Sequence, residues 1–249
     1  MLYFTTYFLN YHYGNNELLE RNKKLLSKIK SMSIIGVNGQ LITIQVDIAN
    51  GLPSWDVVGL PDASIKESKQ RVRAALKNIG YDIPSRKIII NLAPANIKKE
   101  GSLFDLPIAI GIISDLENFN NDVLNEYFLV GELSLDGSIN RINGVLPMCI
   151  EAYNLGIKKA IVPYENRFEA GVVKDLEIYP AKNLEEVINH FNEIHIIKRF
   201  VLEPNYFLKS HTSLLDFSSV KGQEKIKRAL EIAASGGHNC LLIGSPGSR

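Results

Sequence analysis

The sequence contains little cysteine, with only Cys149 and Cys240 among its 249 residues. Two thiols are too few for a disulfide scaffold or a cysteine-rich zinc site, and they favour a reducing compartment, which we take to be the cytoplasm. Neither positive nor negative charge dominates, since the sequence has 28 Lys and Arg residues and 27 Asp and Glu residues. The net charge of +1 excludes a global attraction to nucleic acid or acidic membranes, although one face can still be basic.

Long apolar runs are also missing. The longest, from Leu103 to Leu116, carries Asp105 and Asp115 and is shorter than the roughly 20 residues that a membrane helix needs. A signal peptide begins with a positively charged segment, and no basic residue precedes the aromatic-rich residues 1–13. We therefore expect no membrane association, and we interpret residues 1–31 as an extension whose segment 15–31 forms a polar, basic helix.

Metal-ligand spacing is absent among the histidines. None of them forms a pattern such as H-x-x-x-H with a carboxylate, so we predict no metal site. The five are His12, His190, His195, His211 and His238. Asp105 and Glu132 are single carboxylates without a visible acid–base partner, and we expect them to serve as structural hydrogen-bond acceptors.

Alternating strand and helix patterns begin near residue 33 and predict an α/β protein. A hairpin is expected around Asn38-Gly39, because this dipeptide favours a two-residue turn. Its second strand alternates apolar and polar residues, which predicts one buried face. Residues 87–92 are continuously apolar, which is typical of a strand covered on both sides. Further strands are predicted at 55–60, 128–134, 159–162 and 176–179, and helices at 104–113, 143–155, 165–172, 184–191 and 223–234.

A helix is predicted from Pro61 to about Ile79, with Asp62 or Ser64 as its N-cap. Its apolar face carries Ile65, Val72, Leu76 and Ile79, and a second face carries Lys66, Arg73 and Lys77. A basic helix face of this kind is usually solvated, and we favour that interpretation over contact with nucleic acid.

The last residues suggest a nucleotide site. An apolar run, Cys240 to Ile243, leads into Gly244-Ser245-Pro246-Gly247-Ser248 and then Arg249. A buried strand followed by such a turn is how the phosphate-binding pattern G-x-x-x-x-G-K-[ST] begins. Gly244 takes the place of the first glycine of this pattern. The lysine and the Ser or Thr of the pattern have no counterpart in residues 1–249. We expect residues 216–249 to be poorly packed and Leu241, Leu242 and Ile243 to lack a covered face.

Several separate blocks of sequence, in order, resemble the YifB/ComM family of magnesium-chelatase-like AAA+ proteins. The blocks are Asn50-Gly51-Leu52-Pro53, Val58-Gly59-Leu60-Pro61-Asp62, Glu67-Ser68, Arg71-Val72-Arg73-Ala74-Ala75-Leu76, Asn91-Leu92-Ala93-Pro94-Ala95, Lys99-Glu100-Gly101-Ser102-Leu103-Phe104-Asp105-Leu106-Pro107-Ile108-Ala109, Val220-Lys221-Gly222-Gln223 and Gly236-Gly237-His238-Asn239. The resemblance covers roughly residues 32–249, and its many blocks make it more specific than a lone glycine-rich loop.

The resemblance implies a domain with the fold of the Lon protease domain (ribosomal S5 domain 2-like), followed by the start of an AAA+ ATPase module. We divide the chain into an extension (1–31), a ChlI domain (32–192), a linker (193–215) and an incomplete ATPase start (216–249). Gly244 to Ser248 would then contact the phosphates of ATP, and Val220, Gly222 and Gln223 would flank the adenine. For the full-length family the resemblance implies ATP and Mg²⁺ as cofactors, hexamer formation, and a link to DNA processing, with branch migration in natural transformation.

We interpret the chain as an N-terminal fragment or truncated product that does not bind ATP productively on its own. A non-enzymatic interaction domain is the first alternative. The second is a Lon-like peptidase with a Ser-Lys dyad. Ser102 lies near the position of the nucleophile, but Leu146 and Pro147 stand where Lon has its lysine, and a serine without a base is inert. Lys98, Lys99, Lys158 and Lys159 could replace that lysine only if the fold brings one to Ser102. We expect Ser102 to cap the following helix or close a turn instead.

Overall fold

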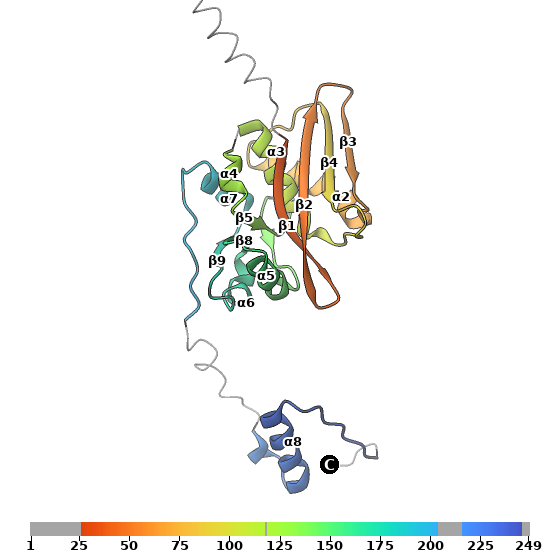
Figure 1. Cartoon of the computed structure of the whole chain (residues 1–249), viewed down its shortest axis with the longest axis vertical. Helices are drawn as coiled ribbons and strands as arrows, with labels where there is room; N and C mark the ends of the chain where they lie inside the picture. Colours follow the sequence, from red (N-terminus) through yellow and green to blue (C-terminus); the bar gives the residue numbers. More distant parts are fainter. Residues whose placement is uncertain (1–25, 118, 204–215, 246–249) are drawn as a thin grey trace, which may run out of the picture. The chain divides into compact units, whose positions relative to one another are not determined.

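A computed structural model describes residues 26–117, 119–203 and 216–245 (Figure 1). The predictions for residues 1–25, for most of the linker, and for Pro246, Gly247 and Ser248 lie outside these described residues. The chain divides into two compact units, one ending at Leu202 and the other beginning at Glu203. Each unit is described by itself.

The first unit is built on a mixed sheet of seven strands in the order β3-β4-β2-β1-β5-β8-β9. Strands β1, β2 and β4 are antiparallel neighbours, whereas β3 runs parallel to β4, and β5, β8 and β9 continue parallel from β1. The bounds are β1 Ser27–Ile35, β2 Asn38–Ala49, β3 Ser54–Val58, β4 Lys87–Ala93, β5 Tyr127–Leu129, β8 Lys159–Pro163 and β9 Glu177–Ala181. A two-stranded ladder pairs β6 (Glu132–Leu133) with β7 (Ile139–Asn140). The predicted α/β class is therefore confirmed.

Helices cover both faces of this sheet. The first core lies between the sheet and α2 and α3, with buried residues such as Ile44, Val72 and Ile110. The second core lies on the opposite side, where Met32 and Phe128 pack with Met148 of α5. The helical bounds are α2 Ala63–Asn78, η1 Ser102–Phe104, α3 Asp105–Glu117, α4 Asn121–Leu124, α5 Val145–Asn154, η2 Tyr164–Asn166, α6 Arg167–Ala170 and α7 Leu184–Phe191.

Strand β1 corrects the prediction of a helix over residues 15–31. Residues 27–31 belong to β1, which pairs along its whole length with β2. Ser27, Ile29 and Ser31 are buried, while Lys28 is exposed and Lys30 half-buried between them. Pairing with β2 overrides the weak local preference for helix, because a helix would expose Ile29 and leave the edge of β2 unpaired.

The β1–β2 hairpin is confirmed, but its turn is Gly36-Val37 and not Asn38-Gly39. Ile35 and Asn38 form the closing pair, and Gly36 adopts a φ of +63°, which glycine allows without strain. Gly39 has a different role. A Cβ there would lie 2.7 Å from the backbone oxygen of Pro147, so the absent side chain lets α5 pack closely against β2.

Strand β4 differs from the prediction of a strand covered on both sides. Ile88, Ile90 and Leu92 are buried, whereas Ile89 and Asn91 are only half-buried. The apolar residues of β4 therefore pack mainly on one face of the sheet, against the first core. The alternation predicted for β2 is confirmed, because Ile42, Ile44, Val46 and Ile48 are at most 2% exposed.

The strand predicted at 128–134 is divided into β5 and β6. Between them, Gly131 N–H donates to Leu103 O at 2.9 Å and Gly131 O accepts from Leu106 N–H at 3.0 Å. The chain thereby leaves the large sheet and runs past the start of α3. This break brings Glu132 within hydrogen-bonding distance of Ser102.

The first unit extends beyond the predicted domain boundary at residue 192. Ile197 is buried and donates its N–H to His190 Nδ1 at 3.1 Å. Phe200 N–H donates to Ile178 O of β9 at 2.8 Å. These contacts keep residues 197–200 in the packed unit, where we had placed the start of a linker.

The described part of the second unit consists of η3 (Phe217–Ser219), α8 (Glu224–Gly236) and an irregular segment to residue 245. The helix predicted at 223–234 is confirmed. No described residue of this unit is buried, and Leu241, Leu242 and Ile243 are 82%, 57% and 89% exposed. The predicted uncovered apolar run is therefore confirmed, although it does not form the expected strand, since no described strand pairs with it.

Among the described residues, no helix combines the length and apolar character that crossing a membrane requires.

Candidate functional site

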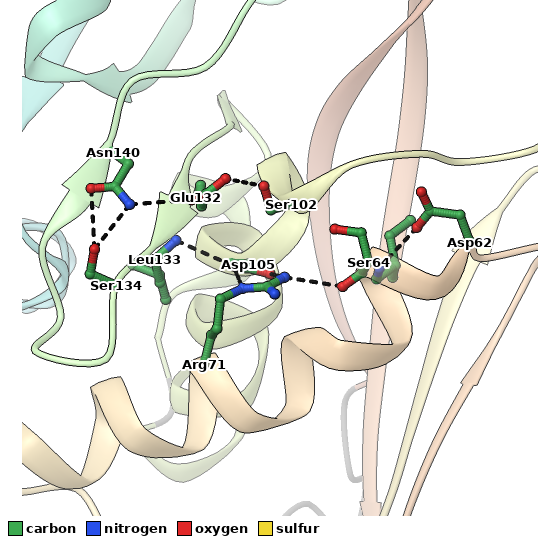
Figure 2. Close-up of polar contacts among 10 residues, drawn as sticks. Asp62, Ser64, Arg71, Ser102, Asp105, Glu132, Leu133, Ser134 and Asn140 are labelled. Carbon is green, nitrogen blue, oxygen red and sulfur yellow. Dashed lines mark hydrogen bonds and ion pairs between the residues drawn. The ribbon is translucent and has the colours of Figure 1, made fainter.

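Polar side chains gather where α2, the start of α3 and the β6–β7 ladder meet (Figure 2). Ser102 and Asp105 come from the turn that opens η1 and α3, Arg71 from α2, and Glu132 and Asn140 from β6 and β7. The break between β5 and β6 and the capped start of α2 bring these distant segments together. Asp62 supplies that cap by accepting the N–H of Ile65 at 2.9 Å, which confirms one of the two predicted caps.

Arg71 and Asp105 form a two-point ion pair. Arg71 Nε donates to Asp105 Oδ2 at 2.6 Å, and Arg71 Nη2 donates to Asp105 Oδ1 at 3.0 Å. The Asp105 side chain is 1% exposed and also accepts the N–H of Leu133 at 3.3 Å. Burial raises the pKa of Asp105 to about 6, against the opposing effect of the Arg71 guanidinium. The prediction that Asp105 is a structural acceptor is confirmed.

Ser102 donates its hydroxyl to Glu132 Oε2. The other carboxylate oxygen, Glu132 Oε1, accepts from Asn140 Nδ2 at 3.3 Å, and Asn140 Nδ2 also donates to Ser134 Oγ at 2.9 Å. Of the two roles predicted for Ser102, a cap on the following helix is wrong, whereas its backbone carbonyl does close the η1 turn by accepting the N–H of Asp105. Gly101 is the residue before η1, and the Ser102 side chain turns to Glu132 because β6 runs beside it. Glu132 is thus a structural acceptor, as predicted.

Lys99 is fully buried, although it is one of the lysines that could have completed a dyad. Its Nζ donates to Gly59 O at 2.9 Å and to Pro94 O. Its backbone also pairs with the segment before α2, since Asp62 N–H donates to Lys99 O at 3.0 Å. Burial lowers the pKa of the Lys99 amine. Lys99 therefore fastens its loop to the end of β3 and is not directed at Ser102.

The remaining lysines are also engaged or directed elsewhere. Lys98 pairs with Glu100 at 2.6 Å in solvent, Lys159 pairs with Glu126 at 2.6 Å, and Lys158 is exposed. Pro147 lies within α5 and has no amine. Among the described residues, none of the four candidate lysines is hydrogen-bonded to Ser102. The fold does not assemble the Ser-Lys dyad that the peptidase alternative requires.

The described nucleotide contacts that we predicted flank α8 of the second unit, because Val220, Gly222 and Gln223 precede this helix and Gly244 and Ser245 follow it. Val220 is 43% exposed, Gly222 has a φ of +71°, and Gln223 is the N-cap of α8. Gly244 and Ser245 are exposed and irregular. Their assignment to adenine and phosphates stays a prediction.

Histidine and other metal-ligand residues do not converge within the part of the chain that the structure describes. No group of three or more His, Cys, Asp or Glu side chains there could hold a metal ion. His190 has a structural role: its Nε2 lies 3.1 Å from the Tyr127 hydroxyl, and burial lowers its pKa.

Sequence reasoning missed the partners in this network. Arg71 and Asp105 are 34 residues apart, and Ser102 and Glu132 are 30 apart, so no local pattern connects them. The one available signal was that Arg71, Ser102 and Asp105 lie in the blocks that carry the family resemblance.

Two family models match the chain. Residues 44–166 match the model described as subunit ChlI of Mg-chelatase, and residues 216–249 match the model described as magnesium chelatase, subunit ChlI. The first matched segment contains the whole polar network, and the second contains the predicted nucleotide contacts.

Curated relatives agree with these models. The chain is 42% identical over 223 residues to the uncharacterised protein YifB of Escherichia coli, covering 90% of this chain and 43% of YifB. It is 37% identical over 225 residues to the competence protein ComM of Haemophilus influenzae, covering 90% of this chain and 44% of ComM. It is 26% identical over 179 residues to the Lon protease of Buchnera aphidicola, covering 67% of this chain and 23% of that protease. The chain thus spans less than half the length of these relatives. It belongs to the magnesium-chelatase-like family that includes YifB and ComM.

Proposed function

We propose that this chain is the N-terminal part of an ATP-dependent, DNA-processing protein of the YifB/ComM type. The observation that carries the proposal is the similarity to YifB and ComM over 90% of the chain, including the segment that matches the magnesium chelatase model. ComM is described as a competence protein, and we extend a role in DNA handling from it to this chain. The same proposal includes self-association into a hexamer. It also includes a cytoplasmic location, which the two free cysteines favour because the cytoplasm keeps thiols reduced.

In this proposal the second unit begins the nucleotide site. Gly244 and Ser245 are exposed, and a glycine lets a phosphate approach the backbone closely. Gly222 and Gln223 form the turn into α8 and would flank the adenine. ATP with Mg²⁺ would supply the phosphoanhydride whose hydrolysis drives the protein's work.

The first unit acts in this proposal as a binding domain without peptidase chemistry. A specific observation favours that assignment: Ser102 is bonded to Glu132, while Lys99 is fully buried against two backbone carbonyls. A serine hydroxyl needs a positioned base to become a nucleophile at neutral pH, and a carboxylate held by Asn140 is a much weaker base than a lysine amine.

ATP turnover by the complete protein tests the proposal. We expect Gly244→Asp to abolish hydrolysis, because a carboxylate beside the phosphates repels them. Ala234→Asp is the matched control, since it places the same charge on an exposed position of α8. Turnover that survives Gly244→Asp, or that is absent from the wild-type protein with and without DNA, contradicts the proposed function.

Labelling with a fluorophosphonate tests the assignment of the first unit. We expect no label on Ser102 and no difference between the wild-type chain and Ser102→Ala. Covalent labelling that disappears in Ser102→Ala would restore the peptidase alternative.

A further inference from the structure

One face of α2 carries a fourth basic residue, Lys69, beside the three predicted from the sequence. Lys66, Lys69, Arg73 and Lys77 follow one another at intervals of three and four residues, so they form a single stripe. The stripe is about 16 Å long, from the rise per residue of a helix. The buried residues of α2, among them Ile65 and Val72, lie on a neighbouring face, so Lys66, Arg73 and Lys77 are exposed and Lys69 is half-buried.

The middle of this stripe borders a small cavity. We use the name cationic pocket for the side chains of Trp55 at the start of β3, Lys69 and Arg73 on α2, and Ser85 and Arg86 before β4, all of which line it. The cavity is about 50 Å³. That volume is far below the roughly 300 Å³ at which small-molecule sites begin, so the pocket suits one compact group and not a whole metabolite.

The charges around the pocket are not neutralised. Among the described residues, Lys69, Arg73 and Arg86 form no ion pair, whereas Arg71 on the same helix is fully engaged with Asp105. Three positive charges around a small cavity repel one another and attract an anion.

Trp55 gives a second, independent observation. Its indole nitrogen is buried and has no hydrogen-bond partner among the described residues. A buried donor without an acceptor is unfavourable, because it has lost its hydrogen bond to water. The Trp55 side chain also lines the pocket, so its indole ring would lie beside an anion held there.

We propose that the cationic pocket and the stripe on α2 bind the phosphodiester backbone of a nucleic acid. One phosphate would occupy the pocket between Lys69, Arg73 and Arg86, and neighbouring phosphates would meet Lys66 and Lys77. A free phosphate would need only the pocket, whereas the continuation of the stripe on both sides fits a polymer. Contacts of this kind are independent of base sequence. The inference rests on the proposed function, because it assigns a DNA-contacting surface to a domain that we expect to act in DNA processing.

Fluorescence anisotropy of labelled single-stranded and duplex oligonucleotides tests this surface. We expect Lys69→Gln/Arg73→Gln/Arg86→Gln to weaken binding at least tenfold. The matched control Lys158→Gln/Lys174→Gln/Lys198→Gln removes the same charge from exposed positions elsewhere on the unit and should change binding less than threefold. Log affinity for duplex against log salt concentration should lose about 2–3 units of slope in the first variant, because each phosphate contact contributes about 0.9.

Trp55 provides a direct readout, because it is the one tryptophan in the chain. We expect oligonucleotide to change its emission in the wild-type chain and not in the first triple variant. The double variant Arg73→Lys/Arg86→Lys keeps the charge and should retain most of the binding. If the triple variant fails to fold, Arg73→Gln and Arg86→Gln measured singly give the same comparison.

Three outcomes overturn the proposal: no binding of either oligonucleotide, equal loss in the two triple variants, or a Trp55 response to inorganic phosphate without one to oligonucleotide. The last outcome would identify a small-anion site. A failure of this surface to bind oligonucleotide can be distinguished from a failure of the proposed function. ATP turnover that depends on Gly244 is measured separately and does not require the cationic pocket.

Discussion

The two units of the chain use apolar residues in opposite ways. In the first unit, Ile44, Phe104 and Ile110 are completely buried between a seven-stranded sheet and its helices. In the described part of the second unit, Leu241 and Ile243 are equally apolar but remain 82% and 89% exposed. The difference shows that local apolar runs do not produce a core. A core requires neighbouring strands and helices that remove the run from water.

The largest expected effect concerns two phenylalanines. Phe104→Ala should lower the free energy of unfolding of the first unit by about 3–5 kcal/mol, because Phe104 is fully buried and its removal leaves a cavity. Phe217→Ala is the matched control in the second unit, where the ring is 45% exposed, and it should change that value by less than about 0.5 kcal/mol. Urea unfolding followed by Trp55 emission measures both. Equal effects would remove the contrast between the units.

The second prediction is a pH dependence of the first unit. Because burial raises the pKa of Asp105 from 3.8 to about 6, the unfolded state loses this proton at lower pH than the folded state. The contribution of Asp105 to stability is therefore complete below pH 3.8 and is lost as the pH rises through 6. The total loss should be about 3 kcal/mol. Asp105→Asn lacks this titration. The difference in the free energy of unfolding between the wild-type chain and Asp105→Asn should therefore change between pH 3.8 and about 6. A constant difference would contradict the prediction.

The third prediction separates two cations on α2. Arg71→Met leaves the buried Asp105 carboxylate without its partner and should destabilise the first unit by about 2 kcal/mol at neutral pH. We expect less than for a completely buried pair, since Arg71 is 22% exposed. The double variant Arg71→Met/Asp105→Asn should recover part of this loss. Arg73→Met, two residues along the helix, removes a cation that pairs with no acidic side chain in the described part of the chain, and it should have almost no effect on stability. Equal losses in the two single variants would mean that the ion pair is not what Arg71 contributes.

The smallest expected effect lies in the second unit itself. Ile243→Ala should leave the unfolding of the first unit unchanged, since Ile243 is 89% exposed. Limited proteolysis should cut within residues 216–245 well before it cuts residues 27–202, because exposed backbone with little burial opens at low cost. Cleavage within β1 or β2 at a comparable rate would show that the contrast between the units is smaller than the burial implies.

Several features of the fold could be predicted because their signals are local. The helix predicted from Pro61 to about Ile79, which the structure has at Ala63–Asn78, has a capping residue, an apolar face at helical spacing and a following glycine. The alternation in β2 fixed which of its residues are buried. Such patterns depend on neighbours within a few residues, where steric preference and side-chain spacing decide the outcome.

Other features depend on partners far along the chain. Ser27 to Ser31 form a strand because β2 is available to pair with them, although the preceding lysines and leucines indicate a helix. The turn at Gly36-Val37 follows from the register of that pairing, and Gly39 serves the approach of α5. The cationic pocket combines residues from 55 to 86, and no local pattern connects Trp55 with Arg86.

The sequence by itself determined the α/β class, the family and the helix carrying the basic stripe, because these follow from local periodicity and from ordered blocks of residues. Only the tertiary structure decided the partners of the charged and polar side chains. It placed Arg71 against a buried carboxylate and gave Ser102 a glutamate in place of a lysine. It also brought Lys69, Arg73 and Arg86 to one cavity, where none of them forms an ion pair with another described residue. The physical reason is that an ion pair or hydrogen bond depends on distance and burial, and packing sets both between residues that are remote in the chain.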